Sequence, residues 1–214
     1  MLKFIPNNSS IMGLTLSNLG LFIATGILLA AVFSFIYLND FNKKAELDNI
    51  SNSFTTFVEA MDTKFFENKS RYFFPKKDYD YSISFSTEYI SIQTEGFWNS
   101  DLISRKTFFI KPLPRLDNPN WTSGKMLHSY LKNNFGNFGN ESDPINSSKE
   151  LDVNNYLNII RDSANFSYAL NPFIVDKNKE LYVEKIYVFY DMDGDDSWNK
   201  NIDYKSDLII IYQK

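Results

Sequence analysis

The chain has 214 residues, which is enough for one domain or for one domain with an appendage. It carries 26 acidic and 22 basic residues, for a net charge of -4, and it has no basic run, so nucleic acid is not expected as a partner. It has no Cys and one His, which excludes disulfides, thiol nucleophiles and Cys-based zinc sites and disfavours a His-rich metal centre. Because the sequence pairs no nucleophile with a base, we expect a protein that is not an enzyme.

The first predicted element is a membrane-spanning helix. Residues 4–39 carry no charge, and residues 19–38 (LGLFIATGILLAAVFSFIYL) are apolar except for Thr25 and Ser34. Twenty helical residues span roughly 30 Å, the thickness of the hydrocarbon core of a bilayer. A cleaved secretory signal has a shorter apolar region. A buried helix of a soluble protein, the alternative interpretation, normally has a polar face.

This span divides the chain into three predicted parts: residues 1–13 as a leader or cytoplasmic tail, residues 14–40 as the transmembrane segment, and residues 41–214 as an extracellular α+β domain. The basic residues on either side of the span do not settle its orientation. N-x-S/T sequons are more numerous than the composition predicts, which favours an exported domain on a single-pass cell-membrane protein; an Asn-rich composition is the alternative explanation. The candidate glycosylation sites in the domain are Asn49, Asn68, Asn120, Asn140, Asn146 and Asn165.

Beyond the span, apolar residues continue with helical spacing. They form one stripe: Leu47, Ile50, Phe54, Phe57, Val58, Met61 and Phe65. The residues between them are polar, as expected for a helix that packs against a sheet on one side. The pattern predicts one helix from about Ser17 to about Phe66, with its first half in lipid and its second half in the domain.

After Pro75 the apolar period changes to two, which indicates strands. Three of them are predicted to form an antiparallel meander over residues 81–85, 89–93 and 106–110. Two helices follow, one over residues 125–133 and one that begins at the capping-box match Ser147-Ser-Lys-Glu150. Residues 181–190 and 207–212 predict a terminal hairpin. The expected fold class is α+β, with a long N-terminal transmembrane and amphipathic helix packed on an antiparallel β-sheet and one or two extra short helices.

The N-terminal part resembles type IV pilin-like proteins, particularly the archaeal ones with a class III signal. The resemblance lies in a 13-residue leader that ends in Gly13, followed by an apolar helix that leads into a β-sheet. It implies that a peptidase cuts after Gly13, that Leu14 begins the mature chain, and that helices pack together in a filament while the β domains face outward. The segment LGLFIATGILLAA also resembles the anchor of archaellum accessory proteins, which are not processed. In that case Gly13 only marks the start of a helix.

Small residues in the span permit close approach between membrane helices. They are Gly20, Ala24, Gly26, Ala30 and Ala31. We therefore expect membrane lipid as one partner and homo- or hetero-oligomers through this helix. Two functional hypotheses follow: a pilin-like subunit or accessory protein of a surface filament, or a membrane-tethered module that binds a glycan, a cell-wall component or a surface-layer partner.

An acidic loop between the last two predicted strands is a candidate Ca²⁺ site. Its oxygen-bearing residues are Asp191, Asp193, Asp195, Asn199 and Asp203. Carboxylates at alternate positions of a tight loop provide the hard oxygen ligands that Ca²⁺ prefers. The alternative is a solvated hairpin turn, because Asp-Gly is a common turn dipeptide.

Three tryptophans lie in polar turn contexts, namely Trp98, Trp121 and Trp198. Exposed rings at these positions could stack on sugars or on neighbouring subunits. The alternative is that they fold over the core. His128 has no recognisable partner in the sequence and is expected to be a surface histidine or one whose hydrogen bonds are satisfied.

Overall fold

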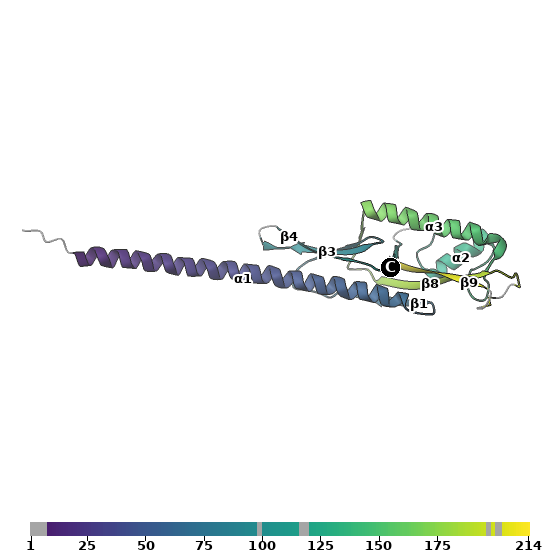
Figure 1. The fold of residues 1–214 in the computed structure, drawn as a ribbon, viewed down its shortest axis with the longest axis horizontal. Coiled ribbons are helices and arrows are strands. Elements are labelled where there is room, and N and C mark those ends of the chain that lie inside the picture. The colour runs from purple at the N-terminus through teal and green to yellow at the C-terminus, as the bar shows by residue number, and fades with distance from the viewer. Residues whose placement is uncertain (1–7, 98–99, 116–119, 196–197, 200–202) are drawn as a thin grey trace, which may run out of the picture.

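The computed structural model describes residues 8–97, 100–115, 120–195, 198–199 and 203–214, apart from the side chains of residues 8–15. The predicted α+β class is confirmed: a long N-terminal helix leads into a domain of two sheets and, within the described residues, two further helices (Figure 1). The part of the helix that leaves the domain projects as a straight extension of the molecule, so the shape is a rod with a globular head at one end.

Helix α1 runs over Asn8–Asp62, a length of roughly 80 Å at about 1.5 Å per residue. It is one continuous element, as predicted, but it begins before Ser17 and ends four residues before Phe66. The helix ends where the ammonium group of Lys185 donates a hydrogen bond to the carbonyl of Asp62. A cation at this position satisfies a terminal carbonyl and interacts favourably with the helix dipole. Phe65 therefore lies beyond the helix and is 89% exposed, so its predicted place in the apolar stripe was wrong.

The strands form two sheets rather than the single predicted sheet. The larger sheet contains β1 (Asn68–Tyr72), β8 (Leu181–Asp191), β9 (Tyr204–Gln213) and β5 (Leu113–Pro114) in this order, with β6 (Ile145–Asn146) also paired to β8. The smaller sheet contains β4 (Asp101–Thr107), β3 (Tyr89–Glu95), β2 (Ser82–Phe85) and β7 (Phe173–Ile174) in this order. The meander β2–β3–β4 and the hairpin β8–β9 are antiparallel, as predicted, whereas β5 and β6 pair in parallel.

Strand β4 lies earlier in the chain than the predicted strand at residues 106–110. It pairs with β3 from Asp101, opposite Glu95, to Thr107, opposite Tyr89. Its face toward α1 carries Ser104, which is buried and lies 2.8 Å from the buried Ser51 hydroxyl, oxygen to oxygen. Small polar residues at this contact let strand and helix approach closely, and they remove the apolar alternation by which strands are found in a sequence.

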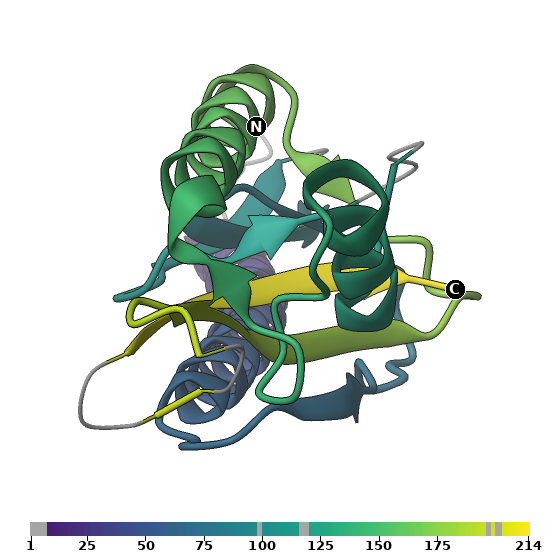
Figure 2. The ribbon, with the colours of Figure 1, turned by 90° about the vertical axis from the view of Figure 1, so that its right-hand side faces the viewer.

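Two hydrophobic cores lie on opposite faces of the β8–β9 hairpin. On one face, Phe54 and Val58 of α1 pack with Val183 and Ile211 of the hairpin and with residues of the smaller sheet such as Phe85. The second core joins the other face to the remaining helices through Leu127, Leu131, Val153, Leu157, Ile186, Val188 and Ile210. Figure 2 shows α1 and α3 on opposite sides of the hairpin. Because both of its faces are covered, β8 is apolar along most of its length.

Helices α2 (Gly124–Phe135) and α3 (Ser147–Leu170) confirm the two predicted helices, with longer bounds. α2 ends at Gly136, whose φ of 96° is the left-handed conformation that glycine adopts readily. The predicted capping box of α3 was wrong by one residue. Asn146 is the N-cap, and its side chain accepts a hydrogen bond from the backbone N–H of Ser148 at 3.0 Å.

Candidate functional site

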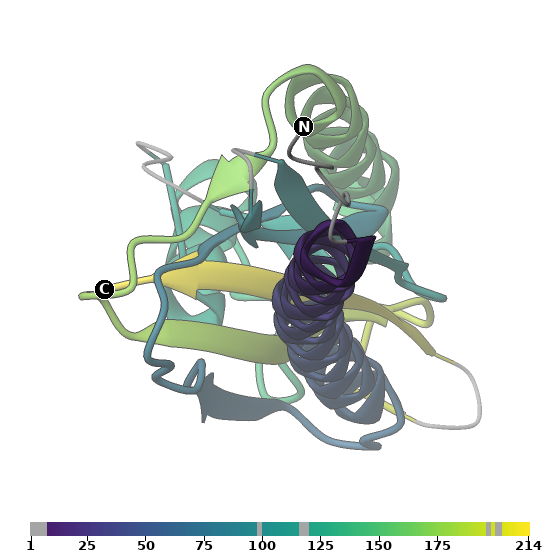
Figure 3. The ribbon, with the colours of Figure 1, turned by 90° about the vertical axis from the view of Figure 1, so that its left-hand side faces the viewer.

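The part of α1 that leaves the domain is the most unusual surface of the molecule. Residues 16–35 are all exposed, and Figure 3 shows this half of the helix projecting from the head toward the viewer. Large apolar side chains point outward around the whole helix; Phe22 is 77% exposed and Phe35 is 74% exposed. α1 is long and apolar enough to cross a membrane, and none of its most apolar stretch is buried within the chain. The hydroxyl of Thr25 donates to the carbonyl of Leu21 at 2.9 Å, which satisfies this polar group inside the apolar segment.

Within the described residues, hydrogen bonds between α1 and the domain begin at Asp40, two residues after the apolar stretch ends. The carboxylate of Asp40 accepts hydrogen bonds from the backbone N–H of Phe97 at 3.0 and 3.2 Å. Lys43 donates to the carbonyl of Glu95 at 3.4 Å, and Lys44 donates to the carbonyl of Ile103. The helix is thus fixed to the β3–β4 hairpin within one or two turns of the end of its apolar half.

The five small residues of the apolar half lie on two faces of α1. At 100° per residue, Gly20, Ala24 and Ala31 share one face, whereas Gly26 and Ala30 share a second face roughly 120° away. A Cβ atom built on Gly20 or Gly26 meets no atom of the chain within 4 Å, apart from its own helical neighbourhood. Both faces are therefore open to other helices, and small residues on two faces suit a helix with more than one neighbour.

Gly13 and Leu14 lie inside α1, whose first residue is Asn8. The interpretation of Gly13 as the start of a helix was therefore wrong, because the backbone is already helical five residues earlier. Cleavage between Gly13 and Leu14 stays a prediction.

The acidic loop after β8 gathers three of the predicted cation ligands. One carboxylate oxygen each from Asp191, Asp193 and Asp195 can be chosen so that all three lie within 4.8 Å of one another. Asp203 has a different role: its two oxygens accept hydrogen bonds from the backbone N–H groups of Met192 at 2.7 Å and Asn199 at 2.6 Å. These bonds tie Asp203 to the part of the chain that follows β8, and Ca²⁺ binding by the three clustered carboxylates stays a prediction.

The carboxylates of this loop repel one another. Desolvation, a hydrogen bond with Asp191 and the negative charges of Asp195 and Asp203 raise the pKa of Asp193. A bound divalent cation would relieve this repulsion.

We expect Ca²⁺ at ten times its dissociation constant to stabilise the full chain by about 1.4 kcal/mol, with a smaller gain in Asp193→Asn. Thermal unfolding with Ca²⁺ and with a chelator measures this difference. An equal gain in both proteins would assign the effect to other carboxylates.

The predicted tryptophans differ in their surroundings. Trp121 is fully buried, so its ring is not available for stacking on a ligand. Its indole N–H donates to the Tyr156 hydroxyl at 2.8 Å, and the guanidinium of Arg115 lies 3.8 Å above the ring. Trp198 is half-buried and packs edge-on against Phe189 with the ring centroids 5.0 Å apart. Trp98 lies outside the described residues.

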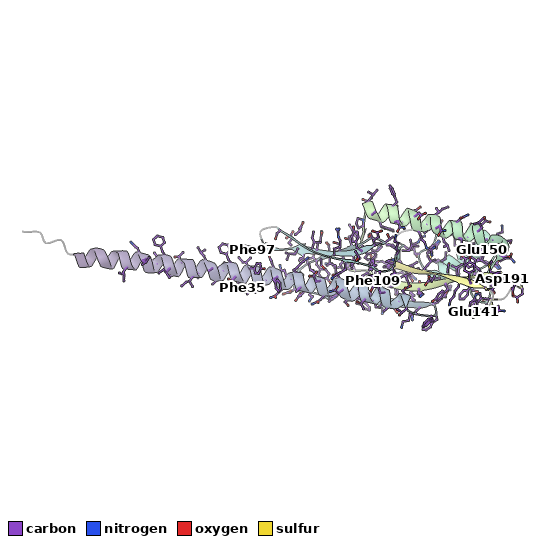
Figure 4. The ribbon with its side chains drawn as sticks, in the orientation of Figure 1. Phe35, Phe97, Phe109, Glu141, Glu150 and Asp191 are labelled. Carbon is purple, nitrogen blue, oxygen red and sulfur yellow. The ribbon has the colours of Figure 1, made fainter. Side chains whose placement is uncertain are left out.

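An aromatic cleft, with a volume of about 1210 Å³, lies at the end of the domain opposite the apolar half of α1. Its aromatic wall consists of Phe65, Phe66, Tyr187, Phe189 and Trp198, and its polar lining includes Glu67, Asn140, Glu141 and Lys205. Figure 4 labels Glu141 at this end of the molecule. The cleft was not predicted from the sequence, because its wall combines the segment after α1 with the β8–β9 hairpin, which are more than 100 residues apart in the chain.

His128 is a satisfied histidine, as predicted, but it has a partner that the sequence did not reveal. Its Nε2 lies 3.2 Å from a carboxylate oxygen of Glu67, and its Nδ1 lies 2.8 Å from the carbonyl oxygen of Phe138. Burial lowers the pKa of His128, but the hydrogen bonds with Glu67 and Phe138 raise it by a larger amount. The net shift of this pKa is therefore upward. Burial raises the pKa of Glu67, but the contact with His128, the hydrogen bond from the Tyr187 backbone N–H and the charge of Lys205 together lower it overall.

These two shifts predict a pH window for stability. The contribution of His128 is complete below its ordinary pKa of 6.5 and is lost as the pH rises through the higher folded value. The contribution of Glu67 is complete above its ordinary pKa of 4.5 and is lost as the pH falls through the lower folded value. Unfolding free energy should therefore decrease above pH 6.5, and His128→Gln should flatten this decrease because the chain has one His. An unchanged slope in the variant would contradict the assignment.

Comparisons with protein-family models, with curated proteins and with solved structures found no match.

Proposed function

We propose that the chain is a single-pass, membrane-anchored subunit or accessory protein of a surface filament, similar to type IV pilin-like proteins, with its domain outside the cell. The observation that carries the proposal is the continuity of α1. One unbroken helix has an apolar half that is exposed on all sides and a second half that forms the core of the domain. Removing one exposed Leu, Ile or Phe side chain from water gains about 1.5–3 kcal/mol, so a belt of this size needs lipid or other helices around it.

The two small-residue faces support assembly in addition to anchorage. An isolated anchor requires only apolar side chains, whereas Gly and Ala at these positions weaken the contact with lipid and allow helix backbones to approach. A helix with faces at Gly20 and at Gly26 can pack against two neighbours, as a subunit within a filament does. Prepilin-type processing belongs to this proposal and is tested by the N-terminal residue of the native protein: Leu14 supports a cleaved subunit, and Met1 supports an uncleaved accessory protein.

The exported orientation is supported by the number of sequons. Two of the six candidates in the domain, Asn49 and Asn120, are exposed. The remaining four candidates in the domain are half-buried, and Asn140 and Asn146 already use their side-chain oxygens as hydrogen-bond acceptors for neighbouring residues. Asn120 lies outside helices and strands on the surface, and we therefore propose it as the first position to examine for a glycan.

We expect Gly20→Leu and Gly26→Leu to weaken assembly and leave the fold unchanged. Each added side chain enters open space in the single chain, and leucine favours a helix over glycine by about 0.8–1 kcal/mol. Where two helices are in contact, however, the same side chain separates their backbones. A tenfold loss of association, about 1.4 kcal/mol, is the expected scale.

The measurement is the size of the complexes extracted from native membranes, together with the amount that co-fractionates with filaments. The matched control is Ile23→Leu, a change without added bulk at a position that is 56% exposed. Assembly that is equal in the glycine variants and in the wild type would count against the filament proposal and leave an isolated anchor.

The aromatic cleft favours a second candidate function, that of a membrane-tethered module that binds a glycan. Phe65 is 89% exposed and Phe66 is 63% exposed, and carboxylate and amide side chains lie beside them. Aromatic faces next to hydrogen-bonding groups suit a sugar ring, which has an apolar face and a polar rim. Binding to isolated cell-surface polysaccharide should be lost in Phe65→Ala/Phe66→Ala and retained in Phe109→Ala, since Phe109 is 95% exposed elsewhere on the domain.

A further inference from the structure

The turn between β3 and β4 places an aromatic residue beside the end of the apolar half of α1. The backbone N–H of Phe97 donates to both carboxylate oxygens of Asp40, and the ammonium groups of Lys43 and Lys44 donate to carbonyls of the same hairpin. Gly96 and Ser100 close the turn through a backbone hydrogen bond of 2.7 Å. The height of Phe97 along the helix axis is therefore fixed by the helix itself.

This height coincides with the expected edge of a membrane. The apolar stretch ends at Leu38, and Asp40 lies about 3 Å further along the axis. Helical side chains tilt toward the N-terminus, so the Asp40 carboxylate reaches back toward the apolar half. The interfacial layer on each side of the hydrocarbon core is roughly 5–7 Å thick. Figure 4 labels Phe97 next to Phe35, at the end of the domain nearest to the apolar half of α1, whereas Phe109 lies much farther along α1.

The surface around Phe97 has the composition of a membrane-interface contact. Its side chain is 44% exposed, and Tyr37 and Phe41, which lie at a similar height on α1, are 71% and 59% exposed. Tyr is enriched at this depth because its ring is amphipathic, and Phe side chains of interfacial segments bury at the boundary between headgroups and acyl chains. The charges nearby are mixed: Asp40, Glu95 and Asp101 are acidic, and the two lysines are directed at hairpin carbonyls. This balance suits a zwitterionic lipid surface.

We propose that Phe97, which follows β3 at the end of the hairpin, rests in the interfacial layer of the membrane that anchors α1. The inference depends on the proposed membrane anchorage and adds a second lipid contact, made by the domain itself. Two contacts that are separated across the membrane surface restrict the tilt of the domain, so the aromatic cleft at the opposite end points away from the membrane.

The chain has no Cys, so a single introduced cysteine can carry an environment-sensitive fluorophore at a chosen position. We would label Leu28→Cys, Phe97→Cys and Phe109→Cys in the full chain, reconstituted in phosphatidylcholine vesicles that contain lipids spin-labelled near the headgroup or deep in the acyl chains. Leu28 lies at the middle of the apolar stretch and is 65% exposed. The expected result is loss of emission at position 28 with the deep quencher, loss of emission at position 97 with the shallow quencher, and no loss at position 109.

The outcomes separate this inference from the proposed function. Quenching at position 28 with none at position 97 would overturn the interfacial contact and leave the anchorage intact. Absence of quenching at position 28 would overturn the anchorage, and the inference with it. If the emission of the label at position 97 changed only when subunits assemble, position 97 would contact a neighbouring chain and not lipid, and the lipid contact would be overturned. Quenching at position 97 that increases with anionic lipid would overturn the aromatic contact in favour of one made by Lys43 and Lys44.

A second pair of variants tests the ring of Phe97 itself. A label on Ser100→Cys is expected to be quenched by the shallow lipid when Phe97 is present and to lose this quenching in Phe97→Ser. The Phe97→Ser change keeps the backbone N–H that binds Asp40, so the turn keeps its position on the helix. Equal quenching with and without the ring would overturn the role of Phe97.

Discussion

Leu28→Arg/Leu29→Arg should remove the protein from the membrane fraction. An arginine at the centre of a membrane helix costs about 2.5–3.5 kcal/mol, and each replaced leucine also loses about 0.5 kcal/mol of favourable insertion, so the pair costs about 6–8 kcal/mol. Both leucines are exposed in the isolated chain, at 65% and 51%, so the substitutions break no contact inside the domain. Membrane fractionation after alkaline extraction measures the effect, and circular dichroism of the released protein checks that the domain is folded.

The matched control is Leu151→Arg/Leu170→Arg, which makes the same chemical change on α3. These leucines are 71% and 66% exposed, and the control should stay in the membrane fraction. Retention of the α1 variant in the membrane would show that another part of the protein anchors it. Wild-type protein in the soluble fraction would instead assign the apolar half of α1 to a protein partner.

The two halves of α1 could be predicted from the sequence because each carries its own local pattern. The apolar half is recognised by its length and lack of charge, and the second half is recognised by one apolar stripe. The end of the helix could not be predicted, since it depends on Lys185, which is 123 residues away from Asp62. Phe65 continues the apolar spacing and was assigned to the stripe for this reason, yet the helix has already ended.

The strands show the same limit. β2, β3 and the β8–β9 hairpin have residue patterns of their own, whereas β5, β6 and β7 are two residues long and exist because a partner strand lies beside them. The candidate sites depend on contacts of this kind as well. Glu67 meets His128 across 61 residues, and Asp40 meets Phe97 across 57 residues, so neither pair has a local signal in the sequence.

Phe54→Ala is expected to destabilise the domain by about 3–5 kcal/mol, which is a large share of the roughly 5–15 kcal/mol that stabilises a typical domain. Phe54 is fully buried where the second half of α1 meets both sheets. Its ring centroid lies 5.0 Å from that of Tyr72, 5.3 Å from that of Phe74 and 5.7 Å from that of Phe85. Truncation of Phe54 leaves a cavity between these three rings. The cavity can close only if the rings move inward, and rings that are packed between two sheets and a helix have little freedom to move.

Denaturant unfolding of the full chain in detergent, followed by near-UV circular dichroism, measures this loss, and Phe109→Ala is the control because its ring is 95% exposed. Far-UV circular dichroism should show that much of the helix signal survives the transition, since the apolar half of α1 makes no packing contacts with the domain core and remains helical in detergent. A Phe54→Ala variant as stable as Phe109→Ala would contradict the role of α1 in the core. Complete loss of helix at the domain transition would show that the apolar half needs the folded domain, and this would weaken the case for an anchor that is stable in the membrane by itself.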